Sequence, residues 1–225
     1  MKLVFASNNA HKLSEVRAMM PEGIEVLSLK DIGFEAEIEE TGETLEENSL
    51  IKAQTVWDWI VDSRKSKVES IDGVFADDTG LEIDALNGEP GVYTARWYRR
   101  EPTLTLHKGK EMTDEMLNFH CNRAKALREL EGKENRGCQF RTVITLLMNG
   151  DATLNGGMIQ IEGVVRGRIA EEEYGEGGFG YDPVFIPEGY DKTFGELPAE
   201  LKNSISHRAR AIQELVKVLN DKMMD

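Results

Sequence analysis

The sequence predicts a mixed α/β fold, in which helices flank a mixed β-sheet. Strand-like and helical segments alternate through the first half of the chain. Later, two strongly β segments follow one another across the turn Asn149–Asp151, a pattern typical of an antiparallel hairpin. The chain has 225 residues, 40% of them hydrophobic, which is enough for a sizeable core, and we expect a single domain over residues 1–225.

In the first half of the chain, turn and capping residues bound the elements. Pro21 and Gly23 end the first helix. The capping-box pattern Thr44–Glu47 starts a long second helix, and we expect a bend at Asp77–Gly80 between two strands. The predicted elements are strand Lys2–Ala6, helix His11–Met20, strand Ile24–Leu29, helix Leu45–Asp62, and strands Gly73–Ala76 and Leu81–Leu86.

In the second half, the polar and basic segment Tyr98–Lys110 has no periodic pattern, so we expect an exposed loop. Apolar residues at helical spacing predict one helix before the hairpin and another at the end of the chain. The predicted elements are helix Thr113–Glu131, strands Gln139–Met148, Met158–Val165 and Val184–Ile186, and a final helix from Ser206 to Met223.

The chain is acidic, with a formal net charge of −14, which argues against binding a long nucleic acid. A small polyanion is compatible with this charge if a local basic cluster or a divalent cation carries the attraction. Cys121 and Cys138 are not in a C-x-x-C spacing and give neither a disulfide framework nor a zinc motif. The apolar run at the start is too short for a signal peptide, and no stretch approaches the length of a membrane span. We therefore expect a cytoplasmic protein with no membrane or nucleic acid polymer as partner.

The most informative segment is Val74–Gly80, where an apolar run ends in two adjacent carboxylates. Neighbouring residues on a strand point to opposite faces, so Asp77 and Asp78 do not share one solvated face if the strand continues. A carboxylate at a buried strand end needs a cation or hydrogen-bond donors. Asp, Thr and Gly are also ordinary turn residues. On this segment alone, a solvated turn and a metal site are equally good interpretations.

The turn Ser7–Lys12 joins the first predicted strand to the first helix. Backbone N–H groups and the helix dipole attract anions to such a helix N-terminus. Ser7 and Asn9 can donate hydrogen bonds to phosphate oxygens, and Lys12 adds positive charge. Ordinary capping of the helix by an asparagine of this turn is the alternative.

Glu40 lies in an acidic segment before the capping box. Its carboxylate could approach Asp78 and share a hard cation, since magnesium is usually held by one or two carboxylates together with substrate phosphates. A solvated acidic loop is the alternative, because Glu35, Glu37 and Glu43 surround Glu40 in the sequence. On this segment alone, the solvated loop is the better interpretation.

The segment Gly175–Pro183 contains a literal G-x-G-x-x-G. The dinucleotide fingerprint requires a helix after it, whereas a predicted strand follows here, so this match is misleading. A glycine-rich bend lets a flat ring approach closely. Phe179 or Tyr181 can stack on such a ring, and Asp182 can accept its N–H groups. A glycine-rich surface loop is the alternative.

Ser206 is a good N-cap for the final helix, which puts His207 and Arg208 in its first turn. Basic side chains at this end oppose the helix dipole, which indicates an anionic or electron-rich ligand nearby. A solvated basic turn is an equally good alternative. No segment resembles a nucleophile elbow.

Taken in order, these segments resemble the inosine triphosphate pyrophosphatase family, the noncanonical purine nucleoside triphosphate (dITP/XTP) pyrophosphatases. Each match is modest, but together they span nearly the whole chain and their joint order is highly specific. They are Ser7–Lys12, Glu40–Gly42 with Glu47–Asn48 and Lys52–Ala53, Ala76–Leu81, Pro90–Gly91 with Ala95–Arg96, Gly177–Pro183 and Ser206–Arg208.

The resemblance implies an elongated α/β fold of two lobes with the active site in the cleft between them, a homodimer and a required magnesium ion. By matching position, Asp78 would be the general base and a metal ligand, with Glu40 as the second metal ligand. The residues that would bind the phosphates are Ser7, Asn9, Lys12 and Thr79. Those that would receive the base are Phe179, Gly180, Tyr181 and Asp182, and those that would read its edge are Lys202, His207 and Arg208.

The reaction that the resemblance implies is hydrolysis between the α- and β-phosphates of ITP, dITP or XTP, giving the nucleoside monophosphate and pyrophosphate. Donors from His207 and Arg208 would satisfy O6 of hypoxanthine or xanthine but would confront the N6 amino group of adenine. Such a mismatch can discriminate by roughly 10⁴-fold or more. The sequence does not show how GTP would be excluded.

The sequence departs from the family pattern at two places; we expect the first loop to keep its structure, because the hydroxyl group is retained, whereas the second departure bears on substrate range. The first loop has Ser7-Asn8 where the family usually has Thr and Gly, and the segment Trp97–Met112 is longer than expected. A Maf-like nucleotide pyrophosphatase acting on other modified bases or on pyrimidines is one alternative function, and a noncatalytic nucleotide-binding protein is another. The role of Asp77 is open between support of the metal site and formation of a turn.

Overall fold

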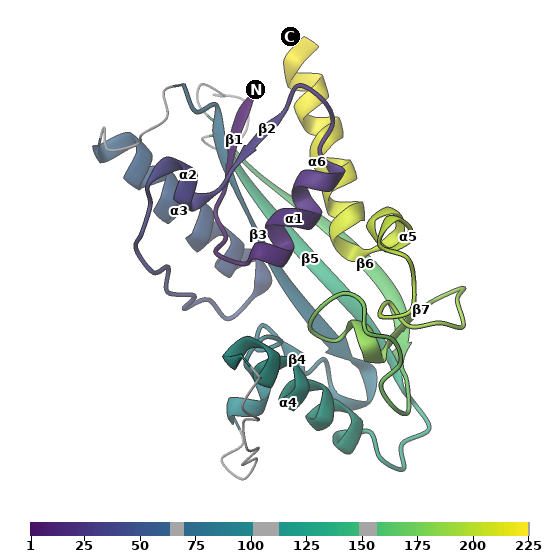
Figure 1. The fold of residues 1–225 in the computed structure, drawn as a ribbon. Helices are drawn as coiled ribbons and strands as arrows, with labels where there is room; N and C mark the ends of the chain where they lie inside the picture. The colour runs from purple at the N-terminus through teal and green to yellow at the C-terminus, as the bar shows by residue number, and fades with distance from the viewer. Residues whose placement is uncertain (64–69, 101–112, 149–156, 225) are drawn as a thin grey trace. The chain divides into compact units, whose positions relative to one another are not determined.

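The computed structural model describes residues 1–63, 70–100, 113–148 and 157–224. Among these described residues, seven strands form one sheet in the order β2-β1-β3-β5-β6-β7, with β4 paired to β3, and helices flank it (Figure 1). The sheet contains parallel and antiparallel pairs, so the predicted mixed α/β fold is confirmed. The strands are β1 (Lys2–Phe5), β2 (Glu25–Leu27), β3 (Gly73–Ile83), β4 (Pro90–Gly91), β5 (Gly137–Met148), β6 (Met158–Ile169) and β7 (Phe185–Pro187). The helices are α1 (Ala10–Met19), α2 (Leu29–Ile32), α3 (Leu45–Ser63), α4 (Asp114–Glu129), α5 (Ala199–Ile205) and α6 (His207–Met224).

The chain groups into two compact units. Unit 1 comprises residues 1–78, 142–163 and 207–225, and unit 2 comprises residues 79–141 and 164–206. The long strands β3, β5 and β6 each contribute residues to both units. The single domain over residues 1–225 stays a prediction, and the expected insertion lies outside the described residues from residue 101 to residue 112.

In unit 1, strand β1 lies between β2 and β3, with Val4 paired to Leu27 on one side and to Val74 on the other. Side chains alternate between the two faces of these strands. Leu3 and Phe5 pack in a core cluster with residues of α1 and α6, whereas Val4 packs in a second cluster with residues of α2 and α3 (Figure 1). Both faces are therefore covered by helices, which explains why these strands are continuous apolar runs in the sequence.

Unit 2 has its own core, which is built around aromatic rings. The ring centroid of Phe185 lies 4.8 Å from that of Phe140 and 5.1 Å from that of Phe194. Ala126 and Leu130, from α4 and its C-cap, pack against the same cluster. Large buried rings of this kind supply much of the apolar area of a small core.

Strand β3 runs without interruption from Gly73 to Ile83, so the predicted bend at Asp77–Gly80 is wrong. The strand continues because Asp77 and Asp78 each find a cationic partner on their own face of the sheet. With both carboxylates paired, the backbone does not have to turn them toward solvent.

The short helices α2 and α5 are not among the elements that the sequence predicts. The predicted strand Ile24–Leu29 ends at Leu27, because Ser28 and Asp31 form a capping box that starts α2. Helices of four and seven residues carry too little periodic pattern to be recognised. The hairpin strands β5 and β6 are present, and the turn between them lies outside the described residues. Within the part of the chain that the structure describes, no helix has the length and apolar character needed to cross a membrane.

Candidate active site

The adjacent residues Asp77 and Asp78 lie on opposite faces of β3. Phe75 packs in the core cluster beneath α1 and α6, and Ala76 packs in the cluster beneath α3. Because side chains alternate along a strand, Asp77 follows Phe75 and Asp78 follows Ala76. The two carboxylates therefore meet different helices and different partners, as the alternation along a continued strand predicts.

Asp78 contacts Lys52 of α3, which also contacts Glu40. The Lys52 ammonium lies 2.9 Å from Asp78 Oδ1 and 2.9 Å from Glu40 Oε1. Burial raises the pKa of Asp78, and the positive charge of Lys52 opposes this rise without cancelling it. From the sequence, Lys52 is assigned no role beyond the family match. A lysine on the apolar stripe of an amphipathic helix was the signal for it, because a buried ammonium needs an acidic partner.

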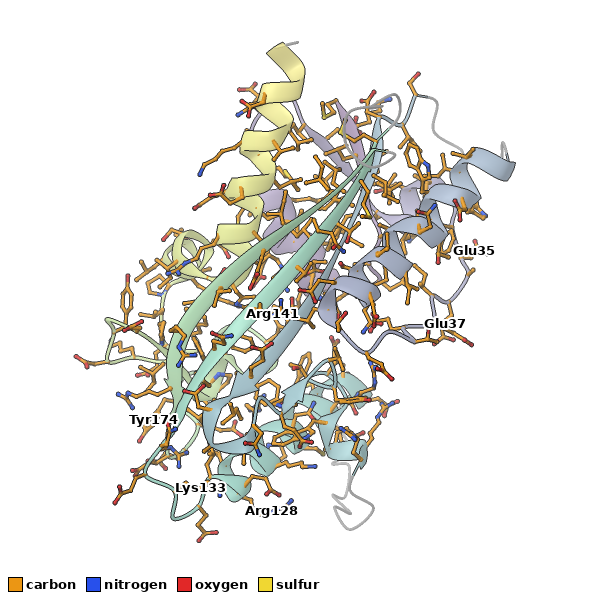
Figure 2. The ribbon with its side chains drawn as sticks, turned by 180° about the vertical axis from the view of Figure 1, so that it is seen from behind. Glu35, Glu37, Arg128, Lys133, Arg141 and Tyr174 are labelled. Atoms are coloured by element: carbon orange, nitrogen blue, oxygen red, sulfur yellow. The ribbon has the colours of Figure 1, made fainter. Side chains whose placement is uncertain are left out.

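Glu40 differs from the acidic residues around it. Glu35 and Glu37, which Figure 2 labels on the segment between α2 and α3, are exposed, whereas Glu40 is half-buried and paired with Lys52. The solvated-loop interpretation therefore fits its neighbours but not Glu40 itself.

The loop that carries Glu40 is tied to α3 by Asn48. Asn48 is fully buried, and its Oδ1 accepts a hydrogen bond of 2.8 Å from the backbone N–H of Gly42. A Cβ atom at Gly42 would lie 2.6 Å from Glu47 Cβ, so only glycine permits this close approach. The carboxylate of Glu47 in turn accepts from the backbone N–H groups of Glu43 and Thr44, which confirms the predicted capping box.

Asp77 lies in a buried cluster of charges on the other face of β3. Its Oδ1 accepts from Lys12 Nζ at 3.0 Å, and its Oδ2 accepts from Arg208 Nε at 3.0 Å. Burial alone would raise the pKa of Asp77, but Lys12 and Arg208 outweigh it and hold the pKa well below the usual range. Arg208 also pairs with Glu15 of α1. Asp77 is thus a fully ionised partner of two residues that were predicted to bind substrate.

Ser7 and Asn9 shape the N-terminus of α1. Asn9 is the N-cap residue, and its side-chain oxygen accepts from the backbone N–H of Lys12 at 3.0 Å. Ser7 Oγ accepts from the backbone N–H of Asn9 at 3.2 Å. The capping alternative is therefore correct for Asn9, and phosphate binding by Ser7 and Asn9 stays a prediction.

In unit 2, Asp182 organises the glycine-rich loop. Its Oδ2 accepts from the backbone N–H of Phe179 at 2.7 Å and from Lys202 Nζ at 2.6 Å. The Lys202 ammonium also lies 4.8 Å from the centre of the Phe179 ring, a cation–π contact. Gly178 has a φ of +73°, and a Cβ atom there would overlap the Asp182 carboxylate. As expected, a 3₁₀ turn and strand β7 follow this loop in place of the helix of a dinucleotide site.

The other loop residues have distinct surroundings. Tyr181 lies in the aromatic core of unit 2, where burial raises the pKa of its hydroxyl group. The half-buried Phe179 therefore offers the accessible ring of the two. Gly180 accepts a hydrogen bond of 2.9 Å from Arg123 of α4 through its carbonyl oxygen. Thr79 lies in β3 and is half-buried.

His207 and Arg208 are the first two residues of α6, and both are buried. The predicted site residues therefore fall into two sets. Those of unit 1 are Ser7, Asn9, Lys12, Glu40, Asp78, His207 and Arg208, and those of unit 2 are Thr79, Phe179, Gly180, Tyr181, Asp182 and Lys202. Direct contacts join Glu40 to Asp78 through Lys52, Lys12 to Arg208 through Asp77, and Phe179 to Lys202 and Asp182.

Comparisons with known proteins identify the family of the chain. The sequence matches the model of the Ham1 family over residues 3–218. It is 45% identical to a protein of Flavobacterium johnsoniae named dITP/XTP pyrophosphatase, over 97% of this chain and 98% of the relative. It is 42% identical to a Bacillus subtilis protein of the same name, over 96% of each chain.

Solved structures match over the same length. The Ham1 protein of Staphylococcus aureus is 34% identical and superposes with a TM-score of 0.73, covering 99% of this chain and 100% of its own. A nucleoside-triphosphatase described as a dITP/XTP pyrophosphatase from Mycobacterium abscessus is also 34% identical, with a TM-score of 0.64 and coverage of 96% and 99%.

Proposed function

The chain belongs to the Ham1 family, and from this premise we propose that it hydrolyses the noncanonical purine nucleoside triphosphates ITP, dITP and XTP to the monophosphate and pyrophosphate. The protein is thus a nucleoside triphosphate pyrophosphatase, a hydrolase that clears these nucleotides from the pool. The resemblance to the inosine triphosphate pyrophosphatases is confirmed by full-length relatives named dITP/XTP pyrophosphatase. The Maf-like alternative is not favoured.

The observation that carries this proposal is the convergence of Asp78 and Glu40 on one point. Both carboxylates lie 2.9 Å from the same ammonium group of Lys52. A protein that only binds nucleotides has no need of two partly desolvated carboxylates beside a cation, because each carries a desolvation cost. A hydrolase uses such groups directly.

Asp78 is the proposed general base for the water that attacks the α-phosphorus. Its raised pKa supports this role, since a carboxylate with a higher pKa is a stronger base. General-base assistance of this kind contributes roughly 10²- to 10⁴-fold to a rate. Lys52 beside it orients Asp78, and its positive charge favours the ionised form of that carboxylate.

Glu40 and Asp78 fit a magnesium ion as their shared ligand. Both supply hard carboxylate oxygens, and their convergence on Lys52 shows that they face a common cationic position. No group of three or more His, Cys, Asp or Glu side chains among the described residues could hold a metal ion. Two carboxylates are the number that suits magnesium when substrate phosphates complete its shell. When bound, the ion neutralises charge on the triphosphate and orients the leaving pyrophosphate.

The remaining predicted residues are assigned to different parts of the nucleotide. The phosphates are assigned to Ser7, Asn9, Lys12 and Thr79, and the base to Phe179, Gly180, Tyr181 and Asp182. Lys202, His207 and Arg208 are assigned to its edge. The half-buried ring of Phe179 supports base stacking, and the Lys202 ammonium at 4.8 Å from that ring supplies donors next to it. The donors assigned to the edge of the base favour O6 over the N6 amino group of adenine.

Two further properties belong to the proposal, a homodimer and a cytoplasmic location. Light scattering of the purified protein tests the dimer. The location is supported by Cys121 and Cys138, which are both buried free thiols, as expected in a reducing compartment.

A substrate panel tests the proposed function. The purified protein with magnesium is given ITP, dITP, XTP, GTP, ATP and modified pyrimidine triphosphates, and released pyrophosphate is measured. We expect hydrolysis of ITP, dITP and XTP, with ATP slower by roughly 10⁴-fold. Equal rates on ATP and ITP would refute the specificity, and a preference for the pyrimidines would restore the Maf-like alternative.

A further inference from the structure

Asp77 is a buried carboxylate that has no assigned role in the proposed reaction. Its side chain is 1% exposed, and it contacts cations from two helices, Lys12 of α1 and Arg208 of α6. It lies on the face of β3 opposite to Asp78, so it does not belong to the carboxylate pair that faces Lys52.

The contacts of Asp77 tie three elements of unit 1 together. Arg208 is 2% exposed and bridges Asp77 of β3 and Glu15 of α1. Lys12 lies one helical turn before Glu15, on the same side of α1. The cluster thus fixes the N-terminal turn of α1 against β3 and α6 through charged groups.

Stability alone does not account for these charges. Buried ion pairs are often replaceable by well-packed apolar residues without loss of stability, whereas removing one partner from a pair is costly. A cluster of this kind is therefore better explained by what it positions than by what it stabilises.

Lys12 is the member of the cluster that reaches solvent. Its side chain is 16% exposed, compared with 1% for Asp77 and 2% for Arg208. An ammonium group carries three N–H donors, and Asp77 Oδ1 accepts one of them at 3.0 Å. The Asp77 contact leaves two further donors at the end of the side chain, where the N-terminus of α1 also attracts anions.

We infer that Asp77 is a positioning residue, which holds the Lys12 ammonium in place for the phosphates of the nucleotide and acts on substrate only through Lys12. This inference rests on the proposed function, in which Lys12 binds phosphates. Asp77 and Asp78 then divide the work between the two faces of one strand. Asp77 orients a phosphate ligand, while Asp78 activates water.

Calorimetric titration with inorganic pyrophosphate tests this inference, because pyrophosphate contains the phosphates but no base. The titrations are done without added divalent metal, so that Glu40 and Asp78 do not contribute through a shared ion. We expect Asp77→Asn to weaken pyrophosphate binding by about tenfold or more, the loss of one well-placed charged hydrogen bond. Lys12→Met is expected to weaken it similarly, and the double variant no more than Lys12→Met alone.

Glu15→Gln is the matched control, since it removes the same charge from the same cluster at a residue that pairs with Arg208. It should bind pyrophosphate within about twofold of the wild type. An equal loss in Glu15→Gln, wild-type affinity in Asp77→Asn, or additive losses in the double variant would each overturn the inference. Failure of the wild type to bind pyrophosphate would overturn it as well.

Should Asp77→Asn not fold, Asp77→Glu keeps the charge while displacing it by one methylene. It is expected to fold, to displace Lys12 and to bind pyrophosphate less tightly, and unchanged affinity would contradict the inference. Steady-state kinetics with ITP separate the outcomes further, because lost positioning raises KM whereas a smaller folded fraction lowers only the apparent kcat. If the wild type binds pyrophosphate but releases none from ITP, the proposed function fails while the binding comparison remains valid.

Discussion

Unit 1 and unit 2 each contain a buried lysine paired with an aspartate, but the third partner differs. In unit 1, Lys52 contacts Asp78 and a second carboxylate, Glu40. In unit 2, Lys202 contacts Asp182 and lies over the ring of Phe179. A second carboxylate makes the first site suited to a cation and to phosphate chemistry, whereas an aromatic ring makes the second suited to a flat base. In the proposed function, the same ion pair therefore serves two kinds of recognition, according to what lies beside the ammonium.

The largest expected effect concerns the Lys52–Asp78 pair, which is the one assigned to catalysis. Asp78→Asn should lower the rate of pyrophosphate release from ITP by roughly 10²- to 10⁴-fold, because the general base is lost. Circular dichroism should show an intact fold, since Lys52 keeps Glu40 as a partner. Asp58→Asn, at an exposed position of the same unit, serves as the control. Unchanged turnover in Asp78→Asn would refute its catalytic role.

The second prediction compares the stability of the two pairs. Asp182→Asn should lower the free energy of unfolding by about 3–5 kcal/mol, because the buried Lys202 ammonium would lose its ion pair with the Asp182 carboxylate. Asp78→Asn should cost less, since Glu40 remains beside Lys52. Urea denaturation monitored by tryptophan fluorescence measures both. Equal losses would show that the third partner does not matter.

The third prediction concerns the ring that distinguishes unit 2. Phe179→Ala should raise KM for ITP roughly 5- to 150-fold, the value of one base–aromatic stacking contact. The affinity for inorganic pyrophosphate should stay unchanged, because pyrophosphate has no base to stack. A parallel loss of pyrophosphate affinity would mean that the two units do not divide the nucleotide as proposed.

A smaller effect tests the loop around that ring through two glycines. Gly178 and Gly180 have φ values of +73° and +63°, so alanine at either position should cost roughly 1–2 kcal/mol of backbone strain. Only at Gly178 would the added methyl group also overlap the Asp182 carboxylate, whereas nothing lies within 4 Å at Gly180. Gly178→Ala should therefore lower ITP affinity and thermal stability more than Gly180→Ala. The reverse order would contradict the role of Asp182 in organising this loop.

The smallest expected effect concerns Asp31, an exposed carboxylate whose contribution to stability is a reference for that of the buried aspartates. Hydrogen bonds from Ser28 and the charge of Arg17 lower the pKa of Asp31 below its ordinary value of 3.8. Its ionised form therefore stabilises the fold above pH 3.8, and that contribution is lost as the pH falls through the lowered pKa. The difference in unfolding free energy between wild type and Asp31→Asn should be below about 1 kcal/mol at pH 7 and should vanish in acid. Urea midpoints at several pH values would show it, and a difference that grows toward low pH would contradict the sign.

Part of the candidate site was predictable from the sequence, because it depends on the alternation of side chains along a strand. The opposite orientation of Asp77 and Asp78 follows from the two-residue repeat of a strand. The partnership of Asp78 with Glu40 rested on family resemblance, since the acidic neighbours of Glu40 favoured a solvated loop. The partners of Arg208 were not predictable, because Glu15 and Asp77 reach it only once α1, β3 and α6 have packed.

The bend expected at Asp77–Gly80 shows the limit of local turn chemistry. Asp, Thr and Gly favour turns when solvent is the only partner that they have. In the folded chain, Lys12 and Lys52 supply partners on both faces, so the strand is retained through the segment. Long-range ion pairs thus override the local preference of these residues for a turn.

The alternation along β3 also limits how this segment can change in evolution. Substituting a residue between Gly73 and Ala76 alters packing at one point. Inserting or deleting a single residue there would exchange the surroundings of the next two carboxylates, bringing Asp78, the proposed base, toward Lys12 and Asp77, the proposed positioning residue, toward Lys52. The proposed site therefore depends on the length of this stretch as well as on the two aspartates that follow it. We expect relatives to differ in residue type between Gly73 and Ala76 but to have no insertion or deletion there.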